Sequence, residues 1–155
     1  MIDLVLECNP DEALMKALGY TRKMITHQPN KGQVINYLEK NPAAIGIVDE
    51  DPGSANPTYF ALFKKDIETK FNLDRLSISS KGTRLIVIRP RLEEWIIKCA
   101  AESKIDIQKH SLPTTGHQLH KIINTRLPQF QMLLKEMTDA KSSALLHLKK
   151  LIDNK

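Results

Sequence analysis

Apolar runs alternate with helical segments through the first half of the chain, and this order restricts the fold more than any other feature. Residues 2–6, 22–26 and 43–48 have the composition of strands, and residues 10–18 and 30–39 have the pattern of helices. Strands separated by helical segments of about 10–15 residues form βαβ units, and their strands lie parallel in one sheet. The sequence therefore predicts an α/β fold with a mostly parallel sheet flanked by helices.

Punctuating residues mark the ends of the two helices. Pro10 suits the first helical position, and Gly19 suits the position after the last turn. Asn30 is a candidate N-cap for the second helix, which Asn41 and Pro42 end.

The middle of the chain continues with a further helix and two strands. Residues 60–71 place their aromatic and aliphatic side chains on one helical face and predict a helix. Residues 73–79 and 83–88 predict strands joined by a turn at 80–82, and residues 92–101 predict an amphipathic helix.

The C-terminal part is predicted to be helical from about residue 115, with a break at Pro128 and a new N-cap at Asp139. We divide the chain into an α/β domain over residues 1–105 and a helical extension over 106–155 that packs on it. The broad apolar faces of the extension also suit a partner surface, such as an ATPase subunit or a second copy of the chain in a homodimer.

A chain of 155 residues has the size of one domain. Cys8 and Cys99 have neither a CxxC nor a zinc-ligand spacing, which is typical of a reducing cytoplasm. No apolar run approaches the roughly 18 residues of a membrane span, and no signal peptide is recognisable. We therefore expect a cytoplasmic protein without a membrane partner.

Charge is distributed unevenly along the chain. The first 75 residues carry 9 Lys and Arg against 11 Asp and Glu, whereas the remaining residues carry 14 against 7. A basic half beside an acidic site suits an enzyme that acts on a polyanion, so nucleic acid is an expected partner. Lysine-rich helices whose charged faces are simply exposed to solvent would give the same excess of basic residues.

Acidic side chains follow two of the predicted strands. Glu7 comes directly after the first strand, and Asp49 and Asp51 come at the end of the third. Ligands bind at the carboxyl ends of strands in an open parallel sheet. Carboxylates gathered there repel one another unless a cation lies between them, and Mg²⁺ takes oxygen ligands. The pattern predicts a site for Mg²⁺ or Mn²⁺, while Asp11 is explained equally well by favourable charge at a helix start.

Three short motifs stand in order along the chain: residues 7–11 (ECNPD) at the end of the first strand, residues 49–53 (DEDPG) at the end of the third, and residues 90–97 (PRLEEWII). They resemble the E-G-x-x-D strand end, the D-x-D element and a P-x-x-E-x-W-L-L segment of the Toprim family, in particular of OLD-type nucleases and RloB-like proteins. The resemblance extends over residues 2–98. Cys8 stands where the family pattern has glycine, and Gly53 comes one residue early.

The resemblance implies a compact Toprim-like or Rossmann-like sheet and a magnesium site made by Glu7, Asp49 and Asp51. It also implies that Lys81 stabilises charge on the scissile phosphate. Glu93 starts a helix directly after a predicted strand, near the same sheet edge as the other acids, and is a candidate fourth metal ligand. Lys81 has a simpler explanation as a solvent-exposed lysine in a turn. Glu93 has a simpler explanation as an acidic residue that the helix dipole favours at a helix start.

Arg84, Arg89 and Arg91 are alternative phosphate ligands, because a guanidinium binds phosphate through two donors. The pair His117 and His120 lacks the further ligands that zinc needs, so we interpret both as surface residues.

The function expected from these features is magnesium-dependent hydrolysis of phosphodiesters in nucleic acid. The alternative is a non-catalytic module of the same fold that regulates or docks an ATPase or another protein. A receiver-type domain phosphorylated on Asp49 is a third hypothesis, but the acid pair and the Lys-Pro that it requires are missing from the sequence.

Overall fold

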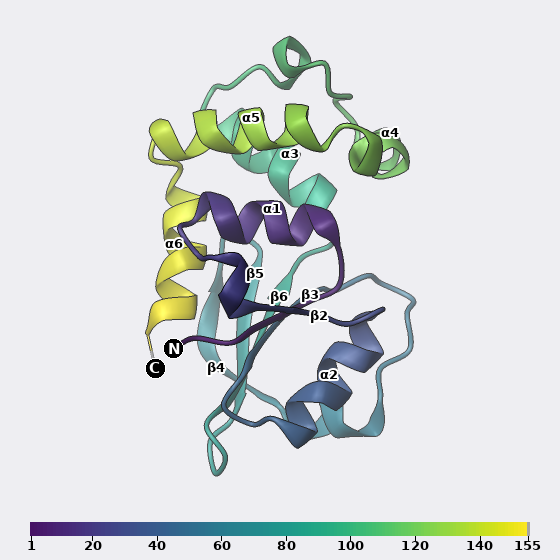
Figure 1. Cartoon of the computed structure of the whole chain (residues 1–155), viewed down its shortest axis with the longest axis vertical. Helices are drawn as coiled ribbons and strands as arrows, with labels where there is room; N and C mark the ends of the chain where they lie inside the picture. Colours follow the sequence, from purple (N-terminus) through teal and green to yellow (C-terminus); the bar gives the residue numbers. More distant parts are fainter. Residues whose placement is uncertain (155) are drawn as a thin grey trace.

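Six strands form one mixed sheet in the order β2-β1-β3-β6-β5-β4 in the computed structural model, which describes residues 1–154 (Figure 1). The strands are β1 (Leu4–Leu6), β2 (Ile25–His27), β3 (Ile45–Asp49), β4 (Lys64–Lys70), β5 (Leu73–Ile78) and β6 (Thr83–Ile88). The four strands β2, β1, β3 and β6 are parallel neighbours, and β5 and β4 continue the sheet antiparallel. The prediction of an α/β fold with a mostly parallel sheet is confirmed.

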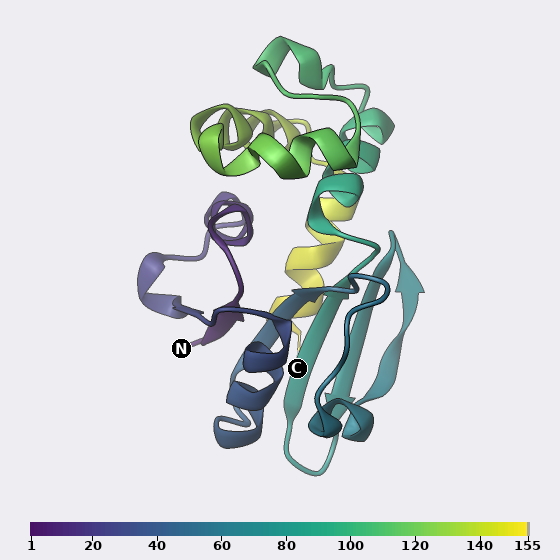
Figure 2. The ribbon, with the colours of Figure 1, turned by 90° about the vertical axis from the view of Figure 1, so that its right-hand side faces the viewer.

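Helices cover both faces of this sheet. They are α1 (Asn9–Ala17), α2 (Lys31–Lys40), α3 (Leu92–Glu102), α4 (Gly116–Ile122), α5 (Leu127–Asp139) and α6 (Ser143–Asp153). Four 3₁₀ turns accompany them: η1 (Arg22–Met24), η2 (Thr58–Leu62), η3 (Ile107–His110) and η4 (Ile123–Thr125). In Figure 2, α2 lies in front of the strands and α6 behind them.

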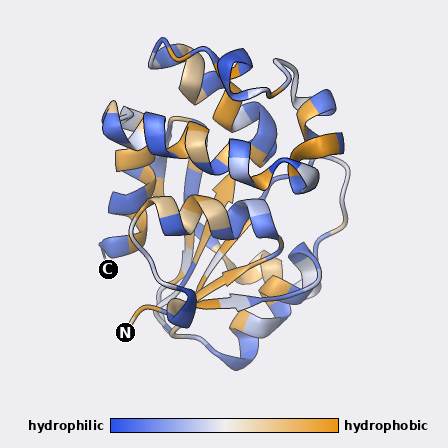
Figure 3. Ribbon diagram, turned by 45° about the horizontal axis from the view of Figure 1, so that its top comes forward, coloured by the Kyte–Doolittle hydropathy of each residue, from blue (hydrophilic) through white to orange (hydrophobic). Residues whose placement is uncertain are grey.

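Alternating side chains of the strands build a separate core on each face. Leu4 and Leu6 contribute to a core with α1, α3, α5 and α6, whereas Val5 contributes to a smaller core with α2 and η2. Strands β1, β3 and β6, in the middle of the sheet, consist mostly of apolar residues, and orange predominates on the central strands in Figure 3. Strands covered on both faces have this composition.

A close approach at Gly46 fixes how α2 lies on the sheet. A Cβ atom at this position would come within 2.8 Å of Leu85 Cδ1 and 2.9 Å of Leu38 Cδ1. Because glycine has no side chain, α2 packs directly over β3.

Several local predictions are confirmed. The Asn30 side chain caps α2 by accepting a hydrogen bond from the Gln33 amide at 2.9 Å. Pro10 lies in the first turn of α1, and Gly19 follows that helix with a positive φ of 100°.

The helix predicted over residues 60–71 is wrong. This segment forms the short η2 turn and then β4, which pairs with β5 at the edge of the sheet. The four apolar residues that suggested a helical face are instead divided between the two cores, because Phe60 and Phe63 join one and Ile67 and Phe71 the other. Pairing with a strand that follows in the sequence overrode the local pattern.

Two further boundaries differ from the predictions. The run 22–26 begins as the η1 turn, and β2 starts only at Ile25. Asp139 ends α5 rather than capping the next helix, and Ser142 caps α6 by accepting from the Leu145 amide. Pro128 occupies the first turn of α5, where the missing amide costs no helical hydrogen bond.

The C-terminal helices lie on the α/β part of the chain. Helix α5 packs against α1, and buried residues from Leu4 to Ile152 belong to one continuous hydrophobic core. None of the helices within residues 1–154 has the length and apolarity required to cross a bilayer.

Candidate acidic site

Four carboxylates gather where the parallel strands end. Glu7 follows β1, Asp49 is the last residue of β3, and Glu93 lies in the first turn of the helix that follows β6. Asp11 joins them from the first turn of α1. The charges of Asp11, Glu93 and Glu7 each raise the pKa of Asp49, so these three acids lie close to it. The topology thus brings together acids from three strand ends, as expected for the carboxyl edge of a parallel sheet.

Asp49 has the most perturbed pKa of the cluster. Burial, followed by the charge of Asp11, raises the pKa of Asp49 to about 8, and a hydrogen bond with the Leu92 backbone offsets only part of this rise. The Oδ1 atom of Asp49 is buried and has no hydrogen-bond partner within residues 1–154. A buried acceptor without a partner destabilises the metal-free site.

Glu93 is buried at the centre of the site and is only 6% exposed. Its Oε1 atom lies 2.9 Å from His120 Nδ1, while its Oε2 atom is buried without a partner among the described residues. The interpretation of His120 as a residue without a role at the site is therefore incomplete. Its imidazole is largely exposed but closes one side of Glu93.

Asp11 is a buried member of the site and not only a favourable charge at a helix start. It is 6% exposed, and burial raises its pKa to about 6, with the charge of Glu93 adding to the rise. The thiol of Cys8 donates to Asp11 Oδ2 at 3.2 Å. The Cys8 thiol therefore occupies one oxygen of this carboxylate.

Glu7 lies nearer the surface than these three acids. Burial, then the charge of Asp11, raises the pKa of Glu7 to about 7, and the positive charge of Lys31 acts in the opposite direction. A carboxyl group with this pKa exchanges its proton near neutral pH.

Lys31 is the basic residue of the site, and sequence reasoning missed it. It begins α2, directly after the N-cap Asn30, and its Nζ donates to the backbone oxygen of Glu50 at 2.8 Å. Burial lowers its pKa, whereas the charges of Asp51 and Glu7 favour its protonated form. Its position just beyond the end of β2 was the available signal, because β2 is a parallel strand like β1 and β3.

Asp51 lies at the rim of the site rather than inside it. Its side chain is half exposed, and Oδ1 lies 3.2 Å from Arg91 Nε. The backbone at Asp51 has a positive φ of 46°, and its amide donates to the Pro90 oxygen at 2.9 Å. The turn therefore directs Asp51 toward Arg91, which is the one of the three candidate arginines that lies beside the acids.

Lys81 does not join these residues. It lies in the turn before β6, at the end of the sheet where the parallel strands begin, and its Nζ lies 5.6 Å from the centroid of the Tyr59 ring. The residue stands next to a strand start, whereas the acids stand at strand ends. Arg84 lies at the same far end, and Arg89 pairs with Asp74 at 3.7 Å.

Within residues 1–154, no group of three or more His, Cys, Asp or Glu side chains is already arranged around one ion position. The donor set nevertheless has the chemistry of a hard-cation site: buried carboxylates, two of them with an unpaired buried oxygen. Glu7 and Asp49 can also share protons, since burial and nearby negative charge raise their pKa values to about 7 and about 8.

No family model, curated protein or solved structure matches this chain.

Proposed function

We propose that the acidic site binds Mg²⁺ or Mn²⁺ and that the protein is a Toprim-like, metal-dependent hydrolase of phosphodiesters in nucleic acid. The observation that carries the proposal is the pair of unpartnered buried oxygens, Asp49 Oδ1 and Glu93 Oε2, in a cluster of four carboxylates. Burying several carboxylates without a cation forces them to take up protons or to lose stability. A divalent cation would relieve both penalties.

Asp49, Glu93 and Asp11 would hold the cation, with Glu7 toward the open side. A bound cation of this kind lowers the pKa of water and neutralises charge that develops on a phosphate. The Oδ2 atom of Asp11 already accepts the Cys8 thiol, so its Oδ1 is the free oxygen.

Proton transfer is assigned to Glu7. Its pKa of about 7 allows its carboxylate to accept a proton from an attacking water at neutral pH and to release it afterwards. The ammonium of Lys31 lies on the same side and would bind a phosphate oxygen of the substrate. In this proposal Lys31 takes the role that the resemblance assigns to Lys81.

Calorimetric titration with MnCl₂ and a plasmid-nicking assay together test the proposal. We expect Mn²⁺ binding and metal-dependent nicking by the unmodified protein, and loss of both in Asp49→Asn and Glu93→Gln. Asp139→Asn is the matched control, because this exposed carboxylate of α5 pairs with Lys135 and with no other cation of residues 1–154. Full nicking by Asp49→Asn would refute the assignment.

A non-catalytic module is the second candidate, and the Cys8–Asp11 hydrogen bond favours it. A thiol that occupies Asp11 Oδ2 removes one metal-facing oxygen, and the Toprim glycine would leave that oxygen free. This candidate predicts no nicking and no heat of Mn²⁺ binding in the unmodified protein. It also predicts that Cys8→Gly gains affinity for Mn²⁺.

A further inference from the structure

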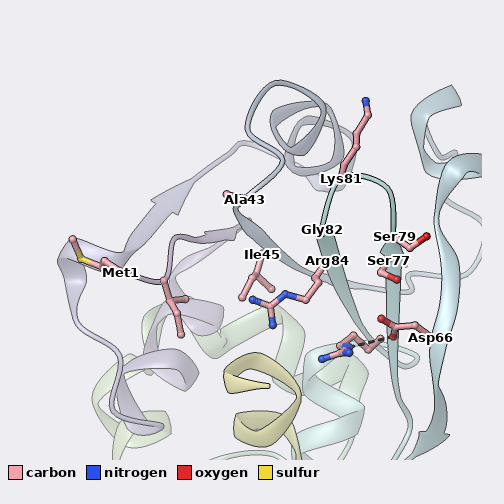
Figure 4. A pocket seen from close by; sticks show the side chains of 11 residues that line it. Met1, Ala43, Ile45, Asp66, Ser77, Ser79, Lys81, Gly82 and Arg84 are labelled. Carbon is pink, nitrogen blue, oxygen red and sulfur yellow. Dashed lines mark hydrogen bonds and ion pairs between the residues drawn. The ribbon is translucent and has the colours of Figure 1, made fainter. Parts of the chain in front are cut away.

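A cavity opens at the opposite end of the sheet from the acidic site. It has a volume of about 730 Å³ and lies where β1, β3 and β6 begin, beside the last turn of α6 (Figure 4). Small-molecule sites in proteins have volumes of roughly 300–1,000 Å³. The size of this cavity therefore suits an organic ligand and exceeds what a single ion needs.

The register of the sheet places polar groups on one wall of the cavity. Arg75, Ser77 and Ser79 are alternate residues of β5 and the turn after it, so their side chains share one face. Arg84 on β6 pairs with Ser77 on one side and with Ile45 of β3 on the other. Arg84 is thus flanked by the hydroxyl-bearing Ser77 on one side and by the apolar Ile45 on the other.

The two arginines differ in how their charge is neutralised. Arg75 is buried, and its Nε lies 3.2 Å from Asp66 Oδ1, with Nη1 donating to the backbone oxygen of Asn154. Arg84 donates from Nη1 alone, to the backbone oxygens of Ile152 and Asn154 at 3.0 and 2.7 Å. These bonds hold the end of α6 on the sheet.

Within residues 1–154, part of the Arg84 guanidinium remains without a partner. Over residues 1–154 no carboxylate pairs with it, and its Nε and Nη2 have no hydrogen-bond partner. Burial, and then the nearby charge of Arg75, lowers the pKa of Arg84. The cavity therefore contains positive charge that the described part of the protein does not balance.

Lys81 adds little to this charge. Its backbone turn borders the cavity, but its ammonium lies over the Tyr59 ring and points away from the cavity in Figure 4. Arg84 is thus the cationic centre of the wall.

We propose that this cavity binds a small organic anion, with a phosphate or carboxylate group attached to an apolar body. The free donors of Arg84 and the hydroxyls of Ser77 and Ser79 bind the oxyanion. The apolar body packs against Ala43 and Ile45 on the opposite wall.

An NMR titration tests this site with phenyl phosphate, benzoate, inorganic phosphate and phenol as probes. We expect phenyl phosphate or benzoate to shift the amides of Ser79, Gly82 and Arg84 saturably, at least tenfold more tightly than phenol or inorganic phosphate. The tighter of the two organic anions identifies the oxyanion. Equal affinity for phenol and for both anions, or shifts that do not saturate, overturns the proposal.

Two variants locate the binding. Arg84→Gln removes the cationic centre and is expected to weaken binding of the tighter probe at least tenfold.

Arg84 also holds α6 on the sheet, so a second variant is needed that leaves this contact intact. Ser79→Asp is such a variant, because it places a negative charge at the exposed rim of the cavity and leaves the bonds from Arg84 to α6 in place. It should weaken the same probe at least fivefold, whereas Ser143→Asp, the same change at an exposed position of α6, should leave affinity unchanged. Unchanged affinity in Ser79→Asp overturns the proposal.

Binding at this cavity is independent of the proposed metal site. Asp49→Asn, at the other end of β3, should leave the affinity for the probe unchanged. Loss of nicking and loss of anion binding therefore report on two separate sites.

Discussion

Asp49 shows how one residue couples the candidate site to the stability of the whole protein. Its carboxyl group is held at the end of β3 with one oxygen buried and unpartnered. Burial and the charge of Asp11 raise its pKa to about 8, whereas an unfolded aspartate has a pKa of about 3.9. Between these two pKa values, Asp49 is therefore protonated in the folded protein and ionised in the unfolded chain.

The metal-free protein should accordingly lose stability as the pH rises from about 4 to 8. In this window the folded state binds more protons than the unfolded state, so the free energy of unfolding decreases with increasing pH. Asp49→Asn removes this group and should make the decrease smaller, as measured by urea denaturation in EDTA at pH 5 and pH 8. The exposed Asp139→Asn should retain the full decrease. An unchanged slope in Asp49→Asn would show that this carboxylate is ionised in the folded state.

Gly46 is the residue at which any side chain disturbs the smaller core. The Cβ of Gly46→Ala would approach three side-chain ends, from Leu85, Leu38 and Val34, at 2.8, 2.9 and 3.2 Å. Overpacking of this kind costs about 1–3 kcal/mol, and urea denaturation should show a loss of this size. Gly53→Ala tests a different effect, since nothing lies within 4 Å of its Cβ and only its positive φ opposes the change. If Gly46→Ala left the free energy of unfolding unchanged, α2 would have moved away from the sheet without loss of stability.

At the scale of elements, each parallel strand leads to a side chain of the candidate site. Strands β1 and β3 place Glu7 and Asp49, β2 leads to Lys31, and β6 leads to Glu93. The position of α2 relative to β2 determines where the ammonium of Lys31 lies, and Asn30 determines where α2 begins. The Asn30 cap of α2 therefore helps to determine the position of Lys31 at the candidate site.

Asn30→Ala should destabilise the protein by about 1 kcal/mol, because the Gln33 amide loses its acceptor. Thermal denaturation of this variant can be compared with Asn56→Ala, which changes an exposed asparagine in the loop before η2. Equal melting temperatures for the two variants would contradict the role of the cap.

Residues 64–70 show why a sequence pattern can predict the wrong type of secondary structure. Its lysines and acids lie at exposed positions of an edge strand, where charged side chains protect the unpaired edge from other chains. The spacing of apolar residues around it suggests a helix, but β5 offers a partner only after the chain has turned at Phe71 and Asn72. The competing contacts are made with the strand that follows, so the pattern of residues 60–71 by itself does not contain them.

At the scale of the molecule, the C-terminal helices belong to the same core as the sheet. Phe130 on α5 is fully buried, and it shares one continuous core with Leu4 on β1 and Ile152 on α6. The boundary that we placed at residue 105 divides the chain by composition and does not interrupt this core.

Phe130→Ala should destabilise the entire protein by about 3–5 kcal/mol and leave a single cooperative unfolding transition. Met132→Ala on the same helix is the control, because Met132 is largely exposed and should change stability little. Circular dichroism and tryptophan fluorescence can follow the transition together, since Trp95 lies in the same core. Two separate transitions would show that the helical extension folds independently.

The sequence alone determined the α/β class, the parallel strands and the acids at their ends, because hydrophobic periodicity and helix caps are local properties. It also indicated Glu7, Asp49 and Glu93 as candidate site residues. Only the tertiary structure decided that Asp11 and Lys31 lie at the site, that Asp51 turns to its rim, and that Lys81 lies at the far end. The physical reason is that burial, charge and proximity depend on which strand ends meet, and strand order in a sheet is set by contacts between distant parts of the chain.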